Sequence, residues 1–403
     1  MDLLKKQNST MSTIQGPLSG ITVVDLTRVM SGPYATMLLS ELGARVIKVE
    51  EPGKGDDSRA YGPFIKGRPC YFNSINRNKE SIALDLRQDE DRAIFESLLA
   101  GADVLTENFR PGVMKKLGYA WESLHARFPK LIYASISGYG HTGPDSHKPG
   151  YDMVMQGVTG MMSITGEAEG EPCRTGISIA DVGTGMFAAT AINAALLHRE
   201  RTGASSHIDL AMFDCMLSML ETPITRYQMT GEIATRMGSL HPSIMPFEAF
   251  PTKDGHITLA CGNDKLFRQF CTAICRQDLA ENPDYLTNVK RVENRTPLRE
   301  EIGKELLKAT TEEWISHLEP LGLAAGPINN VMQAITSPQA TARNMVLETI
   351  DPVLGAIKVV GSPFKFSTFP EHNTRKLAPE LDEDRLRLIE EFHHSHQKTK
   401  EPL

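Results

Sequence analysis

Hydrophobic positions in the first half of the chain follow two alternating patterns. Short apolar runs occur at 21–26, 44–50, 102–108 and 131–137, and such runs are typical of buried strands. Between them, apolar residues recur every three or four positions, as in 35–42, which predicts helices. Strands that alternate with helices predict right-handed crossovers and a parallel sheet that helices cover on both faces.

This pattern continues to about residue 225 and then changes. A helix over 181–199 and a strand over 206–212 complete the first part. After them, the residues at 252–255 predict the turn of a β-hairpin. Shorter helices follow near 264–276, 296–308 and 311–318, before strand-like runs return at 346–369 and a charged amphipathic helix begins at 382.

The length of the chain agrees with two domains. A single hydrophobic core rarely keeps growing in a chain of 403 residues. We therefore predict an α/β protein with a large Rossmann-like parallel-sheet domain over 1–225, to which 346–403 returns. The second, smaller domain is predicted to be α+β and to cover 226–345.

Composition and charge exclude several kinds of partner. The chain has 40% hydrophobic and 23% charged residues and a net charge of -7, so it has no overall attraction to nucleic acid or to an anionic membrane. We found no apolar run near the roughly 18 residues that span a bilayer and no targeting signal. The six cysteines show no zinc-type spacing, and the histidines at 393, 394 and 396 lack acidic partners. We expect a cytoplasmic protein with reduced thiols, no metal site, no membrane segment and no nucleic-acid partner.

Asp181 is the residue with the most informative surroundings. It begins the predicted helix over 181–199, and Gly183 and Gly185 follow within one turn. A carboxylate there can be approached closely by a substrate and kept ionised by the helix N-terminus, so Asp181 is a candidate nucleophile. Aspartate is also a preferred N-cap residue. On this segment alone, a helix cap is the simpler interpretation.

Two further segments suggest ligand binding. The run 138–143 matches G-x-G-x-x-G, but Pro144 and Pro149 prevent a helix from starting there, which disfavours a nicotinamide dinucleotide site. After the strand over 102–108, the residues Asn108, Phe109 and Arg110 combine an amide, an aromatic ring and a cation, which suit a purine and a phosphate. Cations also follow other predicted strands, although each one alone is typical of a solvated surface charge. They are Lys48, Lys54, Arg77, Lys79, Arg87, Lys115 and Lys116.

Ordered matches along nearly the whole chain resemble the class III CoA-transferases, the family of formyl-CoA transferase and the carnitine CoA-transferases. The segments that carry the resemblance are Gly16-Pro-Leu-Ser-Gly20, Ser31-Gly-Pro33, Leu42-Gly-Ala-Arg-Val-Ile-Lys48-Val-Glu50, Asn78-Lys79, Glu107-Asn-Phe109, Pro149-Gly-Tyr151-Asp152, Asp181, Gly326-Pro327 and Ser362-Pro-Phe-Lys365.

The resemblance implies a site and an assembly. It implies that Asp181 takes the acyl group, that CoA thioesters are substrates, that no cofactor is permanently bound, and that two subunits form an interlocked homodimer. It also implies the residues that hold CoA, which are Leu84, Arg87, Asn108, Phe109, Lys116 and Tyr151, with Asp152 nearby.

Racemases in this family carry a histidine before the aspartate of a Gly-His-Asp pattern, where this chain has Tyr151. Proton transfer between two faces of a carbon needs two acid/base groups, and a tyrosine with a pKa of about 10 is a poor substitute at neutral pH. The sequence therefore favours transfer. A 2-methylacyl-CoA isomerase that uses Tyr151 and Asp181 is the alternative, followed by an NAD(P)-dependent oxidoreductase.

Departures from formyl-CoA transferase bear on the substrate. Arg28 and Met30 stand where that enzyme has histidine and glutamine, and a cation suits the far carboxylate of a dicarboxylic acyl group. The run 238–247 resembles the succinyl-CoA:glutarate type. We expect succinyl-CoA as donor and a C4–C6 dicarboxylate, such as glutarate, itaconate, mesaconate or malate, as acceptor. The residues that we expect to contact substrate or to stabilise an oxyanion are Arg28, Val29, Met30, Ser31, His241, Ser243, Gly262 and Asn263.

Overall fold

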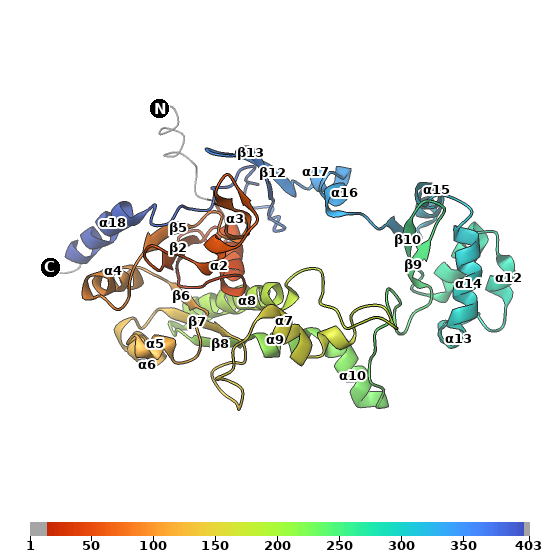
Figure 1. Ribbon diagram of the computed structural model, residues 1–403, viewed down its shortest axis with the longest axis horizontal. Helices are drawn as coiled ribbons and strands as arrows, with labels where there is room; N and C mark the ends of the chain where they lie inside the picture. The colour runs from red at the N-terminus through yellow and green to blue at the C-terminus, as the bar shows by residue number, and fades with distance from the viewer. Residues whose placement is uncertain (1–13, 399–403) are drawn as a thin grey trace. The chain divides into compact units, whose positions relative to one another are not determined.

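The computed structural model describes residues 14–398, which form two compact units (Figure 1). Within that range, unit 1 comprises 14–161, 174–232 and 338–398, and unit 2 comprises 162–173 and 233–337. Residues 226–232 and 338–345, which we expected in the small domain, belong to unit 1. The small unit takes in the separate segment 162–173, which local sequence patterns did not indicate.

Unit 1 is built on a six-stranded parallel sheet with the strand order β5-β2-β1-β6-β7-β8. This confirms the α/β class. The bounds are β1 (Thr22–Asp25), β2 (Arg45–Glu50), β5 (Glu80–Ala83), β6 (Val104–Glu107), β7 (Ile132–Ser137) and β8 (His207–Ala211). Of these, only β5 was not predicted, because it begins with a charged and a polar residue.

Neighbouring strand residues point to opposite faces of this sheet, and a separate core covers each face. On one face, Val23 and Val104 pack with residues of α2 (Ser31–Glu41) and α8 (Ile179–Thr202). On the other, Val24 and Leu105 pack with α4 (Asp89–Ala100), α6 (Trp121–Arg127) and α18 (Arg385–Lys398). The alternation follows from the two-residue period of strands.

The remaining elements of unit 1 are short. They are β3 (Phe64–Ile65), β4 (Arg68–Pro69), α3 (Cys70–Ile75), α5 (Val113–Lys116), α7 (Asp152–Val158), α9 (Met212–Met219), α10 (Glu221–Thr230), α17 (Pro338–Ala342), β12 (Val346–Asp351) and β13 (Gly355–Val360).

Helix α8 corrects one expectation from the sequence. Its 24 residues are long and apolar enough, by length and composition alone, to cross a membrane, whereas we had found no such run. Half of its most apolar stretch is buried inside unit 1. Its Ala189, Ile192 and Leu196 pack against the sheet and α2, as expected for a core helix.

Unit 2 has a three-stranded antiparallel sheet, β11-β10-β9, covered by short helices. The predicted hairpin at 252–255 joins β9 to β10. Phe250, Ile257, Phe267 and Phe270 belong to its core. The bounds are β9 (Phe247–Pro251), β10 (His256–Ala260), α11 (Asp264–Ala273), α12 (Gln277–Glu281), α13 (Asn288–Glu293), α14 (Arg295–Leu306), α15 (Thr311–Leu318), β11 (Ala324–Pro327) and α16 (Val331–Ile335).

Candidate active site

A pocket lies where the strand order of unit 1 reverses direction. From β1 the chain adds β2 and β5 on one side and β6, β7 and β8 on the other, and ligands of open α/β sheets bind at the carboxyl ends of strands beside such a reversal. A cavity of about 380 Å³ is lined there by residues that follow β1, β2, β5 and β6. Its volume is in the range of small-molecule sites.

The lining of this pocket combines apolar and cationic side chains. Leu84, Leu86, Phe109, Val113 and Leu117 supply the apolar surface, and Arg28, Arg87 and Arg110 supply the cations. Such a set can enclose a purine ring and neutralise phosphates. Of the residues expected to bind CoA, Leu84, Arg87 and Phe109 line this cavity.

The other expected CoA-binding residues lie elsewhere. Asn108 donates a hydrogen bond to the Arg28 carbonyl oxygen at 2.7 Å and accepts one from the Arg28 N–H at 2.8 Å. Lys116 is exposed on α5. Tyr151 and Asp152 begin α7, near Asp181.

Arg28 points into the pocket. Its guanidinium lies 5.0 Å from the centre of the Phe109 ring, and its Nη1 lies 3.7 Å from Oδ2 of Asp57. Arg28 thus already has two partners, of which Phe109 lines the cavity. This placement offers no support for the expectation that Arg28 receives the far carboxylate of the acyl group.

The loop between β1 and α2 has an unusual backbone conformation. Val29 has a φ of 68°, which a β-branched residue rarely adopts and which costs on the order of 1–3 kcal/mol. Its N–H donates to Oδ1 of Asp56 at 3.0 Å. The next N–H groups, of Met30 and Ser31, donate to no acceptor among the described residues, as is usual for the start of a helix.

Three of the cations named from the sequence are not on the surface, and one of them, Arg77, is buried beside Glu41. Lys48 and Lys79 are fully buried, and their ammonium groups lie 2.9 Å and 3.0 Å from carboxylate oxygens of Asp56 and Asp25. This corrects their interpretation as solvated charges. A buried lysine needs such a partner, because an unpaired charge in the interior is very costly.

Asp181 does not cap its helix. Helix α8 begins at Ile179 with Ser178 as its N-cap, so Asp181 is the third helical residue. Asp152 provides the capping bonds instead, because its Oδ1 accepts from the N–H groups of Ala180 at 2.9 Å and of Asp181 at 3.4 Å. In residues 14–398, no group donates a hydrogen bond to the Asp181 side chain, so the simpler interpretation from the sequence is wrong.

The protonation of Asp181 also differs from the expectation. Burial, together with the neighbouring charge of Asp152, raises the pKa of Asp181 to about 7. Helix N-termini favour the ionised form of a carboxyl group, but desolvation outweighs that effect here. Asp181 therefore loses its proton near neutral pH.

Tyr71 on α3 is a neighbour that the sequence did not indicate. Burial and the charge of Asp181 raise the pKa of the Tyr71 phenol to about 12. The phenol consequently keeps its proton and remains a hydrogen-bond donor on the Asp181 side of unit 1. Only the fold reveals this, since Tyr71 is 110 positions away in the sequence.

The two glycines of α8 allow neighbouring helices to pack closely against it. From the sequence we had expected them to allow the close approach of a substrate. A Cβ on Gly183 would lie 2.7 Å from Cε of Met219, and one on Gly185 would lie 2.8 Å from the Ser31 carbonyl oxygen. Both α2 and α8 start at the carboxyl edge of the sheet, so they run in the same direction. Asp181, one turn before Gly185, therefore lies beside the loop that precedes Ser31.

The candidate residues of unit 2 form fixed loops. Ser243 N–H donates to Nδ1 of His241 at 3.1 Å, which leaves Nε2 as the protonated nitrogen of a neutral ring. Arg295 donates to the His241 carbonyl oxygen at 2.8 Å. Asn263, next to Gly262, caps α11 by accepting from Leu266 N–H at 2.9 Å.

The other features of the sequence carry no ligand site. Residues 138–143 form a loop, and no helix begins until Asp152, which agrees with the interpretation of that motif. No group of three or more His, Cys, Asp or Glu side chains is arranged for a metal ion within the described residues. The side chains of the histidines at 393, 394 and 396 lie outside that part of the chain.

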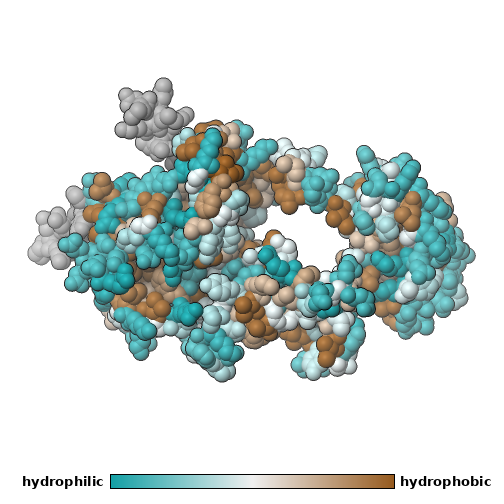
Figure 2. Space-filling view, in the orientation of Figure 1, coloured by the Kyte–Doolittle hydropathy of each residue, from teal (hydrophilic) through white to brown (hydrophobic). Residues whose placement is uncertain are grey.

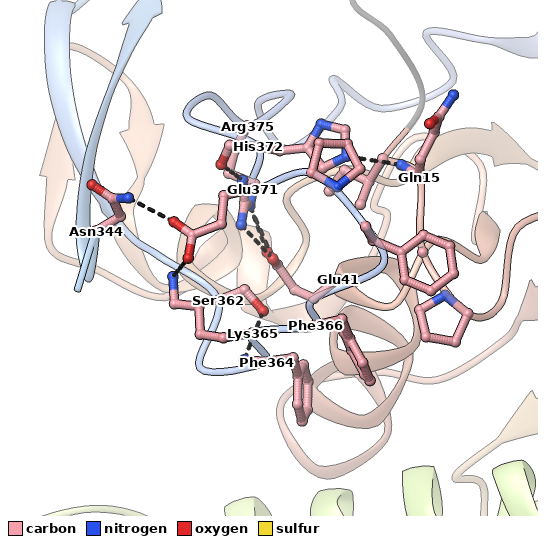
Figure 3. A pocket seen from close by; sticks show the side chains of 15 residues that line it. Gln15, Glu41, Asn344, Ser362, Phe364, Lys365, Phe366, Glu371, His372 and Arg375 are labelled. Carbon is pink, nitrogen blue, oxygen red and sulfur yellow. Dashed lines mark hydrogen bonds and ion pairs between the residues drawn. The ribbon is translucent and has the colours of Figure 1, made fainter.

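A second cavity in unit 1 is a junction between segments far apart in the chain (Figure 3). Its volume of about 40 Å³ is close to that of one water molecule. Glu41 pairs with Arg375 at 2.8 Å, and Lys365 pairs with Glu371 at 3.3 Å. Its charges are thus paired with one another, as expected for a structural contact.

Comparisons with known proteins agree over nearly the full length. The model of CoA-transferase family III matches residues 18–385. The acetyl-CoA:oxalate CoA-transferase of Acetobacter aceti is 41% identical over 95% of this chain and 98% of its own length. The succinyl-CoA:glutarate CoA-transferase of Mus musculus is 39% identical over 88% of this chain and 81% of its own. A crystal structure of a CAIB/BAIF family protein from Brucella suis matches with a TM-score of 0.83 at 38% identity, covering 94% of this chain and all of that one.

The pKa of Asp181 predicts a pH-dependent gain in stability for Asp181→Asn. Below about pH 4 the carboxyl is protonated in both the folded and the unfolded chain and adds no penalty. Its pKa is about 7 when folded and 3.8 when unfolded, so folding becomes less favourable as the pH rises from about 4 to about 7, and the penalty is constant above that. Over this rise in pH the wild type should lose on the order of 2–4 kcal/mol of its free energy of unfolding, because a shift of one pKa unit corresponds to about 1.4 kcal/mol. The variant should keep this free energy.

Urea unfolding of both proteins at pH 5 and pH 8.5 measures this effect. As a control, Asp85→Asn should change the stability by the same amount at both pH values, because the bonds that Asp85 accepts from Arg87 lower its pKa and keep it ionised throughout this pH range. A midpoint difference between wild type and Asp181→Asn that is the same at both pH values would contradict the prediction.

Proposed function

Because this chain belongs to CoA-transferase family III, we propose that it transfers CoA from an acyl-CoA donor to a small carboxylic acid through intermediates on Asp181. CoA-transferase activity itself follows from the family. One observation carries the proposal for Asp181. Its carboxylate lies at the start of the half-buried helix α8, accepts no hydrogen bond within the described residues, and leaves the capping bonds to Asp152.

The transfer takes four steps. An oxygen of the Asp181 carboxylate attacks the donor thioester carbonyl, forming a mixed anhydride and releasing CoA thiolate. The thiolate attacks the aspartyl carbonyl of the anhydride, forming an aspartyl-CoA thioester and releasing the donor acid. The acceptor carboxylate then attacks this thioester, which yields a second anhydride and thiolate again. Attack of the thiolate on the acceptor carbonyl releases the new acyl-CoA and restores Asp181.

The surroundings of Asp181 suit these steps. A carboxylate with a pKa near 7 is more basic than a solvated one, which favours attack, and it is still largely ionised at slightly alkaline pH. Each attack develops a negative oxygen. The unpaired N–H groups of Met30 and Ser31, in the loop beside Asp181, are our candidate donors to it, and one such donor is worth about 3 kcal/mol.

The pocket at the sheet reversal is the proposed site for CoA. Leu84 and Phe109 offer apolar surface for the adenine ring, and Arg87 and Arg110 offer charge for phosphates. Arg28 lines this pocket and also belongs to the loop before α2, which lies beside Asp181. A bound coenzyme would therefore extend toward the nucleophile.

The proposed substrates are succinyl-CoA and a small dicarboxylate. Support comes from the names of relatives, which include succinyl-CoA:glutarate and acetyl-CoA:oxalate CoA-transferases. No specific observation favours the isomerase. Tyr151 is 67% exposed, which does not suit a proton-transfer group that must be screened from water.

Covalent labelling tests the role of Asp181. Wild-type protein mixed with succinyl-CoA and quenched should gain the mass of a succinyl or CoA adduct on the peptide that contains Asp181, and hydroxylamine should trap it. The rate of adduct formation should rise with pH and level off above about 7, because only the carboxylate attacks.

Asp181→Asn should give no adduct and no exchange, while it still binds CoA in the pocket of unit 1. Asp254→Asn, at an exposed turn of unit 2, is a control that should react like the wild type. Exchange activity retained in Asp181→Asn would rule out the covalent scheme.

Acceptor specificity can be measured directly. With succinyl-CoA as donor, C2 to C6 dicarboxylates should accept CoA at least about tenfold faster than monocarboxylates of the same length, since a second charge-paired carboxylate is worth roughly 1.5–3 kcal/mol. Mass spectrometry of the CoA products gives each rate. Equal rates for butyrate, a C4 monocarboxylate, and for a C4 dicarboxylate would refute the dicarboxylate assignment.

We also propose that the chain forms a homodimer. Helix α10 has no buried residue in the single chain, and its large apolar side chains Tyr227 and Met229 are 49% and 81% exposed. Figure 2 shows apolar side chains at the surface. Such a helix needs a partner to cover it. Light scattering should give twice the chain mass of 44.5 kDa, and Tyr227→Glu with Met229→Glu should lower it. A monomer mass for the wild type at micromolar concentration would contradict the proposal.

A further inference from the structure

The loop from Arg28 to Met30, together with the start of α2, is fixed at both of its ends by buried lysines. Lys48 Nζ donates to the Thr27 carbonyl oxygen at 2.7 Å. Lys79 Nζ donates to the Pro33 carbonyl oxygen at 3.1 Å. Neither bond reaches the loop itself, so these contacts set where the loop begins and ends without selecting its conformation.

Two other side chains hold the interior of the loop. Asp56 accepts from the N–H of Val29, and Asn108 bonds to both the N–H and the carbonyl oxygen of Arg28. These bonds hold the peptide group between Arg28 and Val29, on the N-terminal side of Val29, whose φ is 68°. Valine strongly disfavours that conformation, so the peptide group before it must be held for the conformation to persist.

Asp56 can act in this way because it stays charged. Both Asp56 and Lys48 have fully buried side chains, with 2.9 Å between Nζ and Oδ2. Burial alone would raise the pKa of Asp56, but Lys48 holds it well below its usual range. A charged acceptor makes a stronger bond to a backbone N–H than a neutral one.

We infer that Asp56 and Asn108 are positioning residues that hold Val29 in its left-handed conformation and thereby direct the N–H groups of Met30 and Ser31 toward the carbon attacked by Asp181. This inference rests on the proposed function. Neither residue touches the reacting atoms. The sequence offers no sign of it, because Val29, Asp56 and Asn108 lie on three separate loops.

The dependence on residue 29 separates this role from a merely structural one. Glycine adopts a positive φ at no steric cost. A loop with Val29→Gly therefore depends less on the clamp, by which we mean the hydrogen bonds of Asp56 and Asn108. Asp56→Ala in the wild-type background should slow acylation of Asp181 by about 10- to 100-fold, part of the roughly 100- to 1000-fold lost with one oxyanion donor. In the Val29→Gly background the same change should cost no more than about threefold.

The measurement is the single-turnover rate of adduct formation at saturating succinyl-CoA, so that weaker coenzyme binding does not enter it. Glu41→Ala is the matched control. Glu41 is a buried carboxylate at the other end of α2, where it pairs with Arg77 and, as Figure 3 shows, with Arg375. Its loss should lower the unfolding temperature and leave the acylation rate within about threefold, since it removes no bond of the loop.

Equal losses from Asp56→Ala with valine or glycine at position 29 would overturn the inference, as would a loss no larger than that of Glu41→Ala. Should Asp56→Ala fail to fold, Asn108→Ala in the same two backgrounds tests the other half of the clamp by the same criterion. A wild-type protein that forms no adduct refutes the proposed function. If the wild type forms the adduct, and Asp56→Ala and Asn108→Ala form it at the same rate as the wild type, only the positioning role is refuted.

Discussion

Four buried charges lie beneath the loop that enters α2, and the geometry of the site depends on them. Lys48 pairs with Asp56, and Lys79 pairs with Asp25, with no exposed side-chain surface on any of the four. Removing one partner would leave a charge without water or counter-ion, which is among the most costly changes in a protein interior. Lys48 and Lys79 hold the backbone on either side of the loop, Asp56 accepts from Val29 within it, and Lys48 and Asp56 form part of the wall of the adjacent pocket. The position of the loop is therefore tied to the integrity of the core.

Close packing of two helices places the nucleophile against this loop. Gly185 lets the Ser31 carbonyl oxygen approach α8 to a distance that no side chain would allow. Asp181 is thus held in a desolvated position, where burial and Asp152 raise its pKa to about 7. A surface carboxylate would be ionised at lower pH but less basic. The site accepts a destabilising buried carboxyl group in exchange for a stronger nucleophile, a trade common at active sites.

Local patterns were sufficient for most of the sheet and insufficient for the surroundings of Asp181. Apolar runs predicted β1, β2, β6, β7 and β8, because buried parallel strands have a composition that few other segments share. Strand β5 was missed, since it begins with a charged and a polar residue and so shows no apolar run. The interpretation of Lys48 and Lys79 as surface charges was wrong, because a sequence shows the charge of a residue and not the partner that permits its burial. Tyr71 and Asp56 were missed for the same reason.

By itself, the sequence determined the α/β class, the family and the identity of Asp181 as the residue of interest, because these depend on residue types at local spacings and on ordered matches along the chain. Only the tertiary structure decided that Asp152 caps α8 and that Arg28 lies over Phe109. It also decided that α8 packs closely against neighbouring helices at its glycines. Each of these facts is a contact between segments distant in the chain. Such contacts are selected by the packing of the whole sheet and its helices, and no local pattern encodes them.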